Sequence, residues 1–267
     1  MRNNLNLNIN IIDINEHKIE LPTSKLFREI ENKKKLSFIL QNTDITQSII
    51  IKAQKLSNKN PYHNFGHQLG VTESAILIAK AQGLPKKDIN LLSLVGLFHD
   101  ASHTGICRLN DEEIAYEDMM KLISNEEIKQ LGCTKNDIKR LILSTKFSSR
   151  GQSDGILEKI IQDSDLGSIG YGPYYMLYST MGIVDEYKFS ILDYVNQEKQ
   201  FISYLENINS KIFLSDGANQ VFMDPRESLK QISQWPQEVI DYAYSKKYED
   251  ISFADFKKNI DSIINRN

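Results

Sequence analysis

The chain has 267 residues, of which 40% are hydrophobic and 25% charged, and its formal net charge is −3. This length is enough for one large domain or two small ones with a substantial core, so folding need not depend on metals or disulfides. The small negative charge excludes a general field for nucleic acid or for an anionic membrane, and a phosphate would need a local binding site.

The first residues favour an extended conformation. Leu5, Leu7, Ile9 and Ile11 alternate with asparagines, a period of two that is typical of a strand or an extended arm. We predict an N-terminal arm over residues 1–22, with an accessory strand of the same domain as the simplest form.

Nothing in the chain predicts export or a membrane helix, because no apolar run is long enough. Cys107 and Cys133 lie far apart with no CxxC partner, which is typical of reduced thiols in a cytoplasm-like compartment. We therefore expect a soluble cytoplasmic protein that binds no membrane.

From Thr23 onward, the residues at the expected starts and ends of elements are almost all typical of helix caps and helix stops. Thr134 and Asp137 resemble a capping box, Asn110 and Ser252 stand at expected N-cap positions, and Gly83 precedes Leu84-Pro85 as a helix stop. The sequence predicts one all-α domain over residues 23–267, without repeats or linkers. The expected helices cover about 23–40, 44–57, 66–82, 86–102, 110–123, 134–147, 154–168, 173–181, 184–209, 225–245 and 252–265, and residues 147–155 and 214–220 are the expected mobile loops.

The stretch PYHNFGHQLGV, residues 61–71, places His63 and His67 one helical turn apart. His67 leads a row through Val71 and Ala75 that belongs on an inward helix face. An imidazole therefore continues an apolar stripe.

A second unusual stretch is INLLSLVGLFHDASHTG, residues 89–105. Its helix is apolar on nearly every side and ends in His99-Asp100, with His103 one turn later. An unpaired buried charge costs several kcal/mol, so a positive group should compensate Asp100.

The third stretch is ILEKIIQDSDLGSIG, residues 156–170. Asp165 continues a row through Leu157 and Ile161, whereas Asp163 continues the neighbouring row. Spacing alone does not choose between these two carboxylates.

Four of the five histidines and these acids thus fall at the inward ends of three predicted helices. Taken singly, each histidine is better explained as a hydrogen-bonded core residue or a helix cap. Taken together, they favour one or two divalent cations: Zn, Mn, Fe or Co for a mixed nitrogen and oxygen site, and Mg for a companion held mainly by oxygen.

The order His67, His99-Asp100, Asp165 resembles the H…HD…D signature of the HD superfamily of metal-dependent phosphohydrolases. Residues 62–74 (YHNFGHQLGVTES) and 99–105 (HDASHTG) resemble two elements of class I cyclic-nucleotide phosphodiesterases. Residues 141–147 and 163–170 also resemble HD-family segments, so the similarity covers about 61–170. It implies an all-α HD-domain helical bundle.

The resemblance also implies a role for each matching residue. His67, His99, Asp100 and Asp165 would be metal ligands, Asp165 being preferred over Asp163 because it directly precedes a leucine. Asp100 would bridge to a second metal. His103 would support that metal or its water, and His63 would donate a proton to the leaving oxygen, although a hydrogen bond that orients a neighbour is an equal alternative for His63.

The match has gaps. Gly70 stands where the phosphodiesterases usually carry an acid, and Thr104 replaces a proline. Gln220 and Phe222 have the wrong spacing for the purine clamp of those enzymes. Cyclic-nucleotide specificity is therefore not implied.

Four residues are candidates for substrate contact: Asn64, beside the first histidine pair, Lys146 and Arg150, which could bind a phosphate, and Tyr171, which could stack a base. Solvation at the surface is the alternative for Lys146 and Arg150. Tyr171 begins an aromatic stripe, and such stripes more often belong to a core.

The sequence as a whole predicts a metal-dependent phosphohydrolase, preferably a phosphodiesterase that acts on a nucleotide or cyclic nucleotide through metal-activated water. The expected partner is a small-molecule phosphoester or nucleotide. A phosphomonoesterase or nucleotidase with the same site is the first alternative, and a non-catalytic metal-containing nucleotide-sensing module is the second. The presence of both His63 and His103 favours an enzyme, because a purely structural metal site would be closed.

Overall fold

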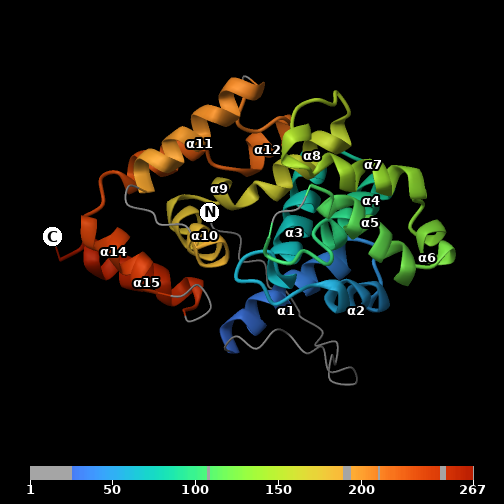
Figure 1. Ribbon diagram of the computed structural model, residues 1–267, viewed down its shortest axis with the longest axis horizontal. Coiled ribbons are helices and arrows are strands. Elements are labelled where there is room, and N and C mark those ends of the chain that lie inside the picture. The colour runs from blue at the N-terminus through green and yellow to red at the C-terminus, as the bar shows by residue number, and fades with distance from the viewer. Residues whose placement is uncertain (1–25, 107–108, 189–193, 210, 247–250, 267) are drawn as a thin grey trace, which may run out of the picture.

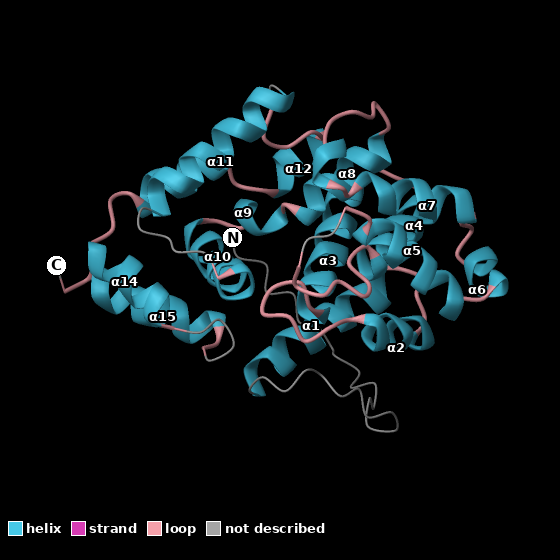
Figure 2. Ribbon diagram, viewed as in Figure 1, coloured by secondary structure: helices cyan, strands magenta, loops and turns pink. Residues whose placement is uncertain are grey.

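The computed structural model describes residues 26–106, 109–188, 194–209, 211–246 and 251–266. All regular secondary structure in these ranges is helical, which confirms the predicted all-α class (Figures 1 and 2). The predicted arm over 1–22, with its possible strand, lies outside the described residues. Among the described helices, none combines the length and the apolar character needed to cross a bilayer.

Helix α3 (Phe65–Ala81) lies at the centre of the half of the molecule that holds the histidines (Figure 1). It packs against α1 (Leu26–Asn42), α4 (Lys86–Phe98), α8 (Ile156–Asp165) and α12 (Asp216–Val221). Every residue of α4 from Ile89 to Phe98 is buried, as its apolar sequence predicted.

Helices α3 and α4 approach closely at Gly96. A Cβ atom placed there would lie 3.0 Å from the Cα atom of Thr72, so a larger residue would force the two backbones apart. This contact fixes how the beginning of α3 and the end of α4 are set against each other.

The remaining helices complete two groups. Near α4 lie α2 (Gln47–Leu56), α5 (Asp111–Leu122), α6 (Asn125–Gln130) and α7 (Lys135–Ser144). The C-terminal group contains α9 (Gly167–Gly170), α10 (Pro173–Tyr187), α11 (Tyr194–Asn209), α13 (Pro225–Ile232), α14 (Gln237–Ser245) and α15 (Phe253–Ile264). The buried hydrophobic side chains of both groups form one cluster.

Three predicted elements need correction. The helix expected over 225–245 is broken into α13 and α14, with Pro236 at the start of α14. The helix expected over 173–181 runs on to Tyr187 as α10 and ends at Lys188 in the left-handed conformation, and the helix expected from 184 begins only at Tyr194 as α11. The loop expected over 214–220 contains α12, whose N-cap Ser215 accepts a hydrogen bond from the Ala218 backbone.

Helix α11 carries a partly buried acid, Glu198, at its contact with α10. Thr180 Oγ1 donates to Glu198 Oε1 at 3.1 Å. Burial raises the pKa of this carboxyl to about 7, more than the hydrogen bond lowers it. Folded protein therefore holds a proton that unfolded protein releases above pH about 4.5, so this group lowers stability progressively as pH rises from about 4.5 to 7.

We expect Glu198→Gln to remove that pH dependence. The free energy of unfolding should rise at pH 8 by about 3 kcal/mol, because one pKa unit corresponds to about 1.4 kcal/mol, and should change little at pH 4.5. Urea denaturation of both proteins at the two pH values measures this. An equal change at both values would show that folding does not shift the pKa of Glu198.

Candidate metal centre

The four predicted ligands come from three helices whose ends meet beside α3. His67 lies in the first turn of α3, His99 and Asp100 directly follow α4, and Asp165 is the last residue of α8. The structure brings all four together, with every ligand atom within 4.8 Å of the others.

The nitrogen and oxygen atoms of this cluster face one another at short distance. His67 Nε2 lies 3.2 Å from Asp100 Oδ2 and 3.2 Å from Asp165 Oδ1. His99 Nε2 lies 3.0 and 3.3 Å from the same two oxygens. Each imidazole therefore faces both carboxylates.

These distances fit a shared divalent cation. Ligands at about 2.0–2.2 Å from a metal lie about 3.0–3.5 Å from their neighbours in tetrahedral or octahedral geometry. Moreover, His67 Nε2, His99 Nε2 and Asp100 Oδ2 are buried and have no hydrogen-bond partner. Buried polar atoms without partners are rare in folded proteins, and a cation would satisfy all three.

The second nitrogen of His99 sets the tautomer of its ring. His99 Nδ1 lies 2.9 Å from the Gly96 carbonyl oxygen, which accepts its proton. In the neutral ring, Nε2 then carries a lone pair directed at the cluster, the arrangement common for metal-binding histidines. The Gly96 carbonyl thus orients a candidate metal ligand.

Charge in the cluster is balanced internally. Burial lowers the pKa of His67 and His99, but the neighbouring carboxylates raise it by more, so both lie above the ordinary histidine value. Burial likewise raises the pKa of Asp100 and Asp165, and the two imidazoles more than reverse this. A cation would replace the protons of the imidazoles as the balancing charge.

The structure also separates Asp163 from Asp165, which spacing alone did not. Asp163 is fully buried and accepts hydrogen bonds from Arg150 and from the backbone of Leu214 and Ser215. Its oxygens are thereby used to anchor α12 to α8. Only Asp165 faces the histidines.

The same network corrects the expected role of Arg150. The side chain is 3% exposed, donates to Asp163 Oδ1 at 3.0 Å, and also donates to the carbonyl oxygens of Gln162 and Ile212. All these partners belong to the protein, and Arg150 does not line the pocket described below. Lys146, for its part, donates to the Leu109 carbonyl and does not line the pocket described below.

A second group lies beside the cluster: His63, His103 and Glu186. His63 Nδ1 is 2.6 Å from Glu186 Oε1, and the backbone amides of Tyr62 and His63 donate to Glu186 Oε2 at 2.8 and 2.9 Å. The His63 and His103 rings stack with centroids 4.4 Å apart. The His63 and His67 centroids are 5.4 Å apart, so this group adjoins the candidate ligands.

The two members that flank His63 differ in charge. Burial raises the pKa of Glu186, but His63 lowers it by more, so the carboxylate is ionised. Burial and the charge of His63 lower the pKa of His103. Since His103 Nδ1 accepts from the Gly105 backbone amide at 3.1 Å, the neutral ring carries its proton on Nε2.

Glu186 was missed from the sequence. It lies on α10 in a row with Tyr175, Ser179 and Gly182, so a carboxylate continues a buried face. The sequence predicted that this helix ends at residue 181, so Glu186 was not seen as part of the row. A helix drawn through 187 would have revealed it.

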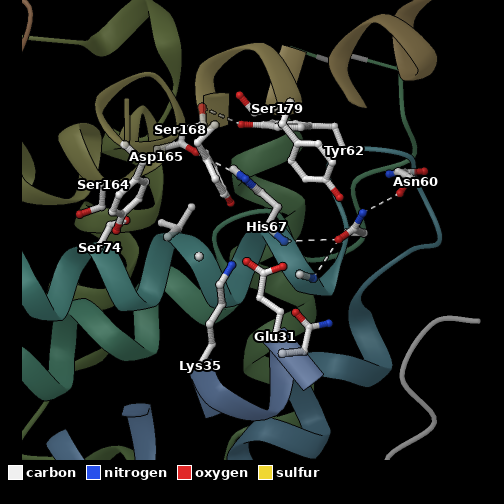
Figure 3. A pocket seen from close by; sticks show the side chains of 18 of the residues that line it. Glu31, Lys35, Asn60, Tyr62, His67, Ser74, Ser164, Asp165, Ser168 and Ser179 are labelled. Carbon is white, nitrogen blue, oxygen red and sulfur yellow. Dashed lines mark hydrogen bonds and ion pairs between the residues drawn. The ribbon is translucent and has the colours of Figure 1, made fainter. Parts of the chain in front are cut away.

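A pocket of about 210 Å³ opens beside the cluster (Figure 3). His67 and Asp165 line it, as do Asn64 and Tyr171, two of the predicted substrate contacts. Asn64 is already used as the N-cap of α3, since its Oδ1 accepts from the Gly66 and His67 amides. Tyr171 is hydrogen-bonded to Ser74 at 2.8 Å across the pocket wall.

No protein-family model matches this chain, and neither does any curated protein. Among solved structures it is similar to LmjPDEB1 in complex with IBMX, at 11% identity over 91% of this chain and 88% of that chain, with a TM-score of 0.45. It is also similar to the phosphodiesterase domain of the RhoPDE fusion protein from the choanoflagellate Salpingoeca rosetta, at 15% identity over 87% and 90% of the two chains, with a TM-score of 0.42. A further structure of the Salpingoeca rosetta rhodopsin phosphodiesterase domain gives 14% identity, 88% coverage of both chains and a TM-score of 0.43. These low scores leave the side-chain geometry as the basis for a functional proposal.

We expect Asp100→Asn and His67→Ala to lose bound metal. Wild-type protein should retain at least one Mn²⁺ or Zn²⁺ per chain after dialysis, measured by mass spectrometry of the elements. The metal should also stabilise it against heat, by about 2.7 kcal/mol at a metal concentration 100 times Kd. Asp154→Asn removes a fully exposed carboxylate and serves as the control. Equal metal content in all four proteins would contradict the ligand assignment.

We expect Arg150→Met to destabilise the fold rather than weaken substrate binding. It leaves Asp163 buried without its charged partner, a change that costs about 3–5 kcal/mol. Chemical denaturation measures the loss. If the variant were as stable as wild type but bound substrate less tightly, Arg150 would be a substrate contact after all.

Proposed function

We propose that this protein is a metal-dependent phosphoester hydrolase, with phosphodiesters as its preferred substrate class. The single observation that carries the proposal is that a cation-fitting set of two imidazoles and two carboxylates adjoins an ordered His63–Glu186 pair. The resemblance of residues 61–170 to the HD superfamily adds support from the sequence.

The imidazoles and carboxylates of the candidate metal ligands lie together at one end of the cavity. When bound there, a divalent cation supplies positive charge that stabilises phosphoryl oxygens and lowers the pKa of water. His67, His99, Asp100 and Asp165 would hold it, and the buried position of His99 excludes bulk water from one side. Only His67 and Asp165 also line the pocket, so a substrate phosphate is expected on their side.

His63 provides the proton that a departing alkoxide needs. Its Nδ1 is held by Glu186, which fixes the plane of the ring. Nε2 then remains to donate a proton to the leaving oxygen. Because two backbone amides also bind Glu186, the carboxylate cannot turn away without losing three hydrogen bonds. A metal site with a structural role alone would not need such a pair.

We expect the protein to hydrolyse bis-p-nitrophenyl phosphate with Mn²⁺ or Zn²⁺ and to be inactive with EDTA. His63→Ala should lower kcat by about 100-fold or more, as loss of a general acid does, while metal content stays at the wild-type level. Glu186→Gln should have a smaller effect in the same direction. The readout is p-nitrophenol release at matched metal occupancy, and a full rate in His63→Ala would remove His63 from the mechanism.

The choice between diester and monoester follows from a parallel assay with p-nitrophenyl phosphate. Faster turnover of the diester supports a phosphodiesterase, and faster turnover of the monoester supports a phosphatase or nucleotidase. No release from either substrate with any of the metals, despite bound cation, would contradict an enzyme and favour a nucleotide-sensing module.

A further inference from the structure

The pocket beside the cluster contains a cation that the proposed reaction does not use. Lys35 projects from α1 toward α3 and lines the pocket together with His67 and Asp165 (Figure 3). Its Nζ lies 3.5 Å from the point that a Cβ atom of residue 70 would occupy, so the ammonium rests against Gly70. Gly70 is about one helical turn beyond His67 on α3, so the Lys35 ammonium lies beside the turn that follows a candidate ligand.

The ammonium has acidic neighbours but no ion pair in the described part of the chain. Glu31 lines the same pocket one turn earlier on α1. Burial raises the pKa of Glu73, the charge of Lys35 opposes that rise, and Glu31 adds to it. Lys35 also slightly offsets the burial that raises the pKa of the Tyr171 hydroxyl. The charge of Lys35 thus acts on groups across the pocket, and none of these groups forms an ion pair with it.

The other walls are polar. Ser74, Ser168 and Ser179 line the pocket with Asn32, and the tyrosine rings are edged by hydroxyls. The volume of about 210 Å³ is below the usual range of about 300–1,000 Å³ for sites that enclose a large apolar ligand. A small ligand with hydrogen-bonding groups fits this lining better than an extended hydrophobic one.

We propose that Lys35 is a specificity-determining residue, and that the natural ligand carries a second anionic group, a carboxylate or a phosphate, about one helical turn from its phosphoester. The inference rests on the proposed function, since the phosphoester is placed beside His67 and Asp165. The Lys35 ammonium binds the second anionic group. Glu31 repels that group and instead accepts hydrogen bonds from the neighbouring hydroxyls of the ligand. The pocket therefore selects small, hydroxylated phosphoesters with at least two acidic groups.

The test compares two probes that differ at one carbon, 3-phosphoglycerate and glycerol 3-phosphate. The first has a carboxylate where the second has a hydroxymethyl group, at a short distance from the same phosphate. Isothermal titration calorimetry with Mn²⁺-loaded wild-type protein should give at least about tenfold tighter binding of 3-phosphoglycerate, the size expected of one charge-assisted hydrogen bond.

Variants assign this preference to Lys35. Lys35→Met should reduce the advantage of 3-phosphoglycerate to about twofold or less, and Lys35→Arg should restore most of it. Glu31→Gln should increase the advantage, because it removes a repelling charge. Lys34→Met deletes the same charge from the adjacent, exposed position of α1 and should leave the advantage unchanged. Thermal denaturation confirms that each variant is folded.

Equal binding of the two probes by wild type, including failure to bind either, would overturn the inference. An advantage that survives in Lys35→Met would do the same. These outcomes are separable from failure of the proposed function, which is read from metal content and from turnover of bis-p-nitrophenyl phosphate by wild type. Hydrolysis of that diester without any probe preference would reject the role of Lys35 alone.

Discussion

The structure depends on the meeting of two imidazoles and two carboxylates at the ends of α3, α4 and α8, where His99 is buried and the other three side chains are partly buried. Burial opposes the charged form of each of these four side chains, so none of them would be charged there without a partner. Their mutual contacts, or a cation that replaces the imidazole protons, supply the compensation. The packing of α3 on α4 at Gly96 and the hydrogen bond between His99 and the Gly96 carbonyl help to hold this cluster in place.

Helix α8 serves two charge systems within one turn. Asp165 faces the histidines, whereas Asp163 is paired with Arg150 and bound to the backbone at the start of α12. The second system has no open coordination position, since every Asp163 oxygen accepts hydrogen bonds. It holds the end of α8 in place, and through it the position of Asp165. An ion pair with a structural role thus stands directly behind a candidate ligand.

Periodicity predicted the helical class and the inward direction of His67, and it placed the pair His99-Asp100 at the end of a buried helix. It could not separate Asp163 from Asp165, because two adjacent rows of one helix are both apolar and only tertiary contacts show which row faces the histidines. Glu186 was lost when the expected helix ended too early. Arg150 was misassigned because an arginine in a polar loop resembles a surface residue, and its buried partner is distant in sequence.

The candidate ligands and the pocket differ in how locally they are encoded. His67, His99, Asp100 and Asp165 stand at helix ends within one continuous third of the chain, and short patterns reveal them. Lys35 and Glu31 reach the site only because α1 packs on α3, and no local pattern marks them. The Lys35 ammonium lies beside Gly70, where α3 carries no side chain. If Lys35 has the proposed role, substitutions on α1 should change which substrate binds without disturbing α3, α4 and α8, which carry the candidate metal ligands.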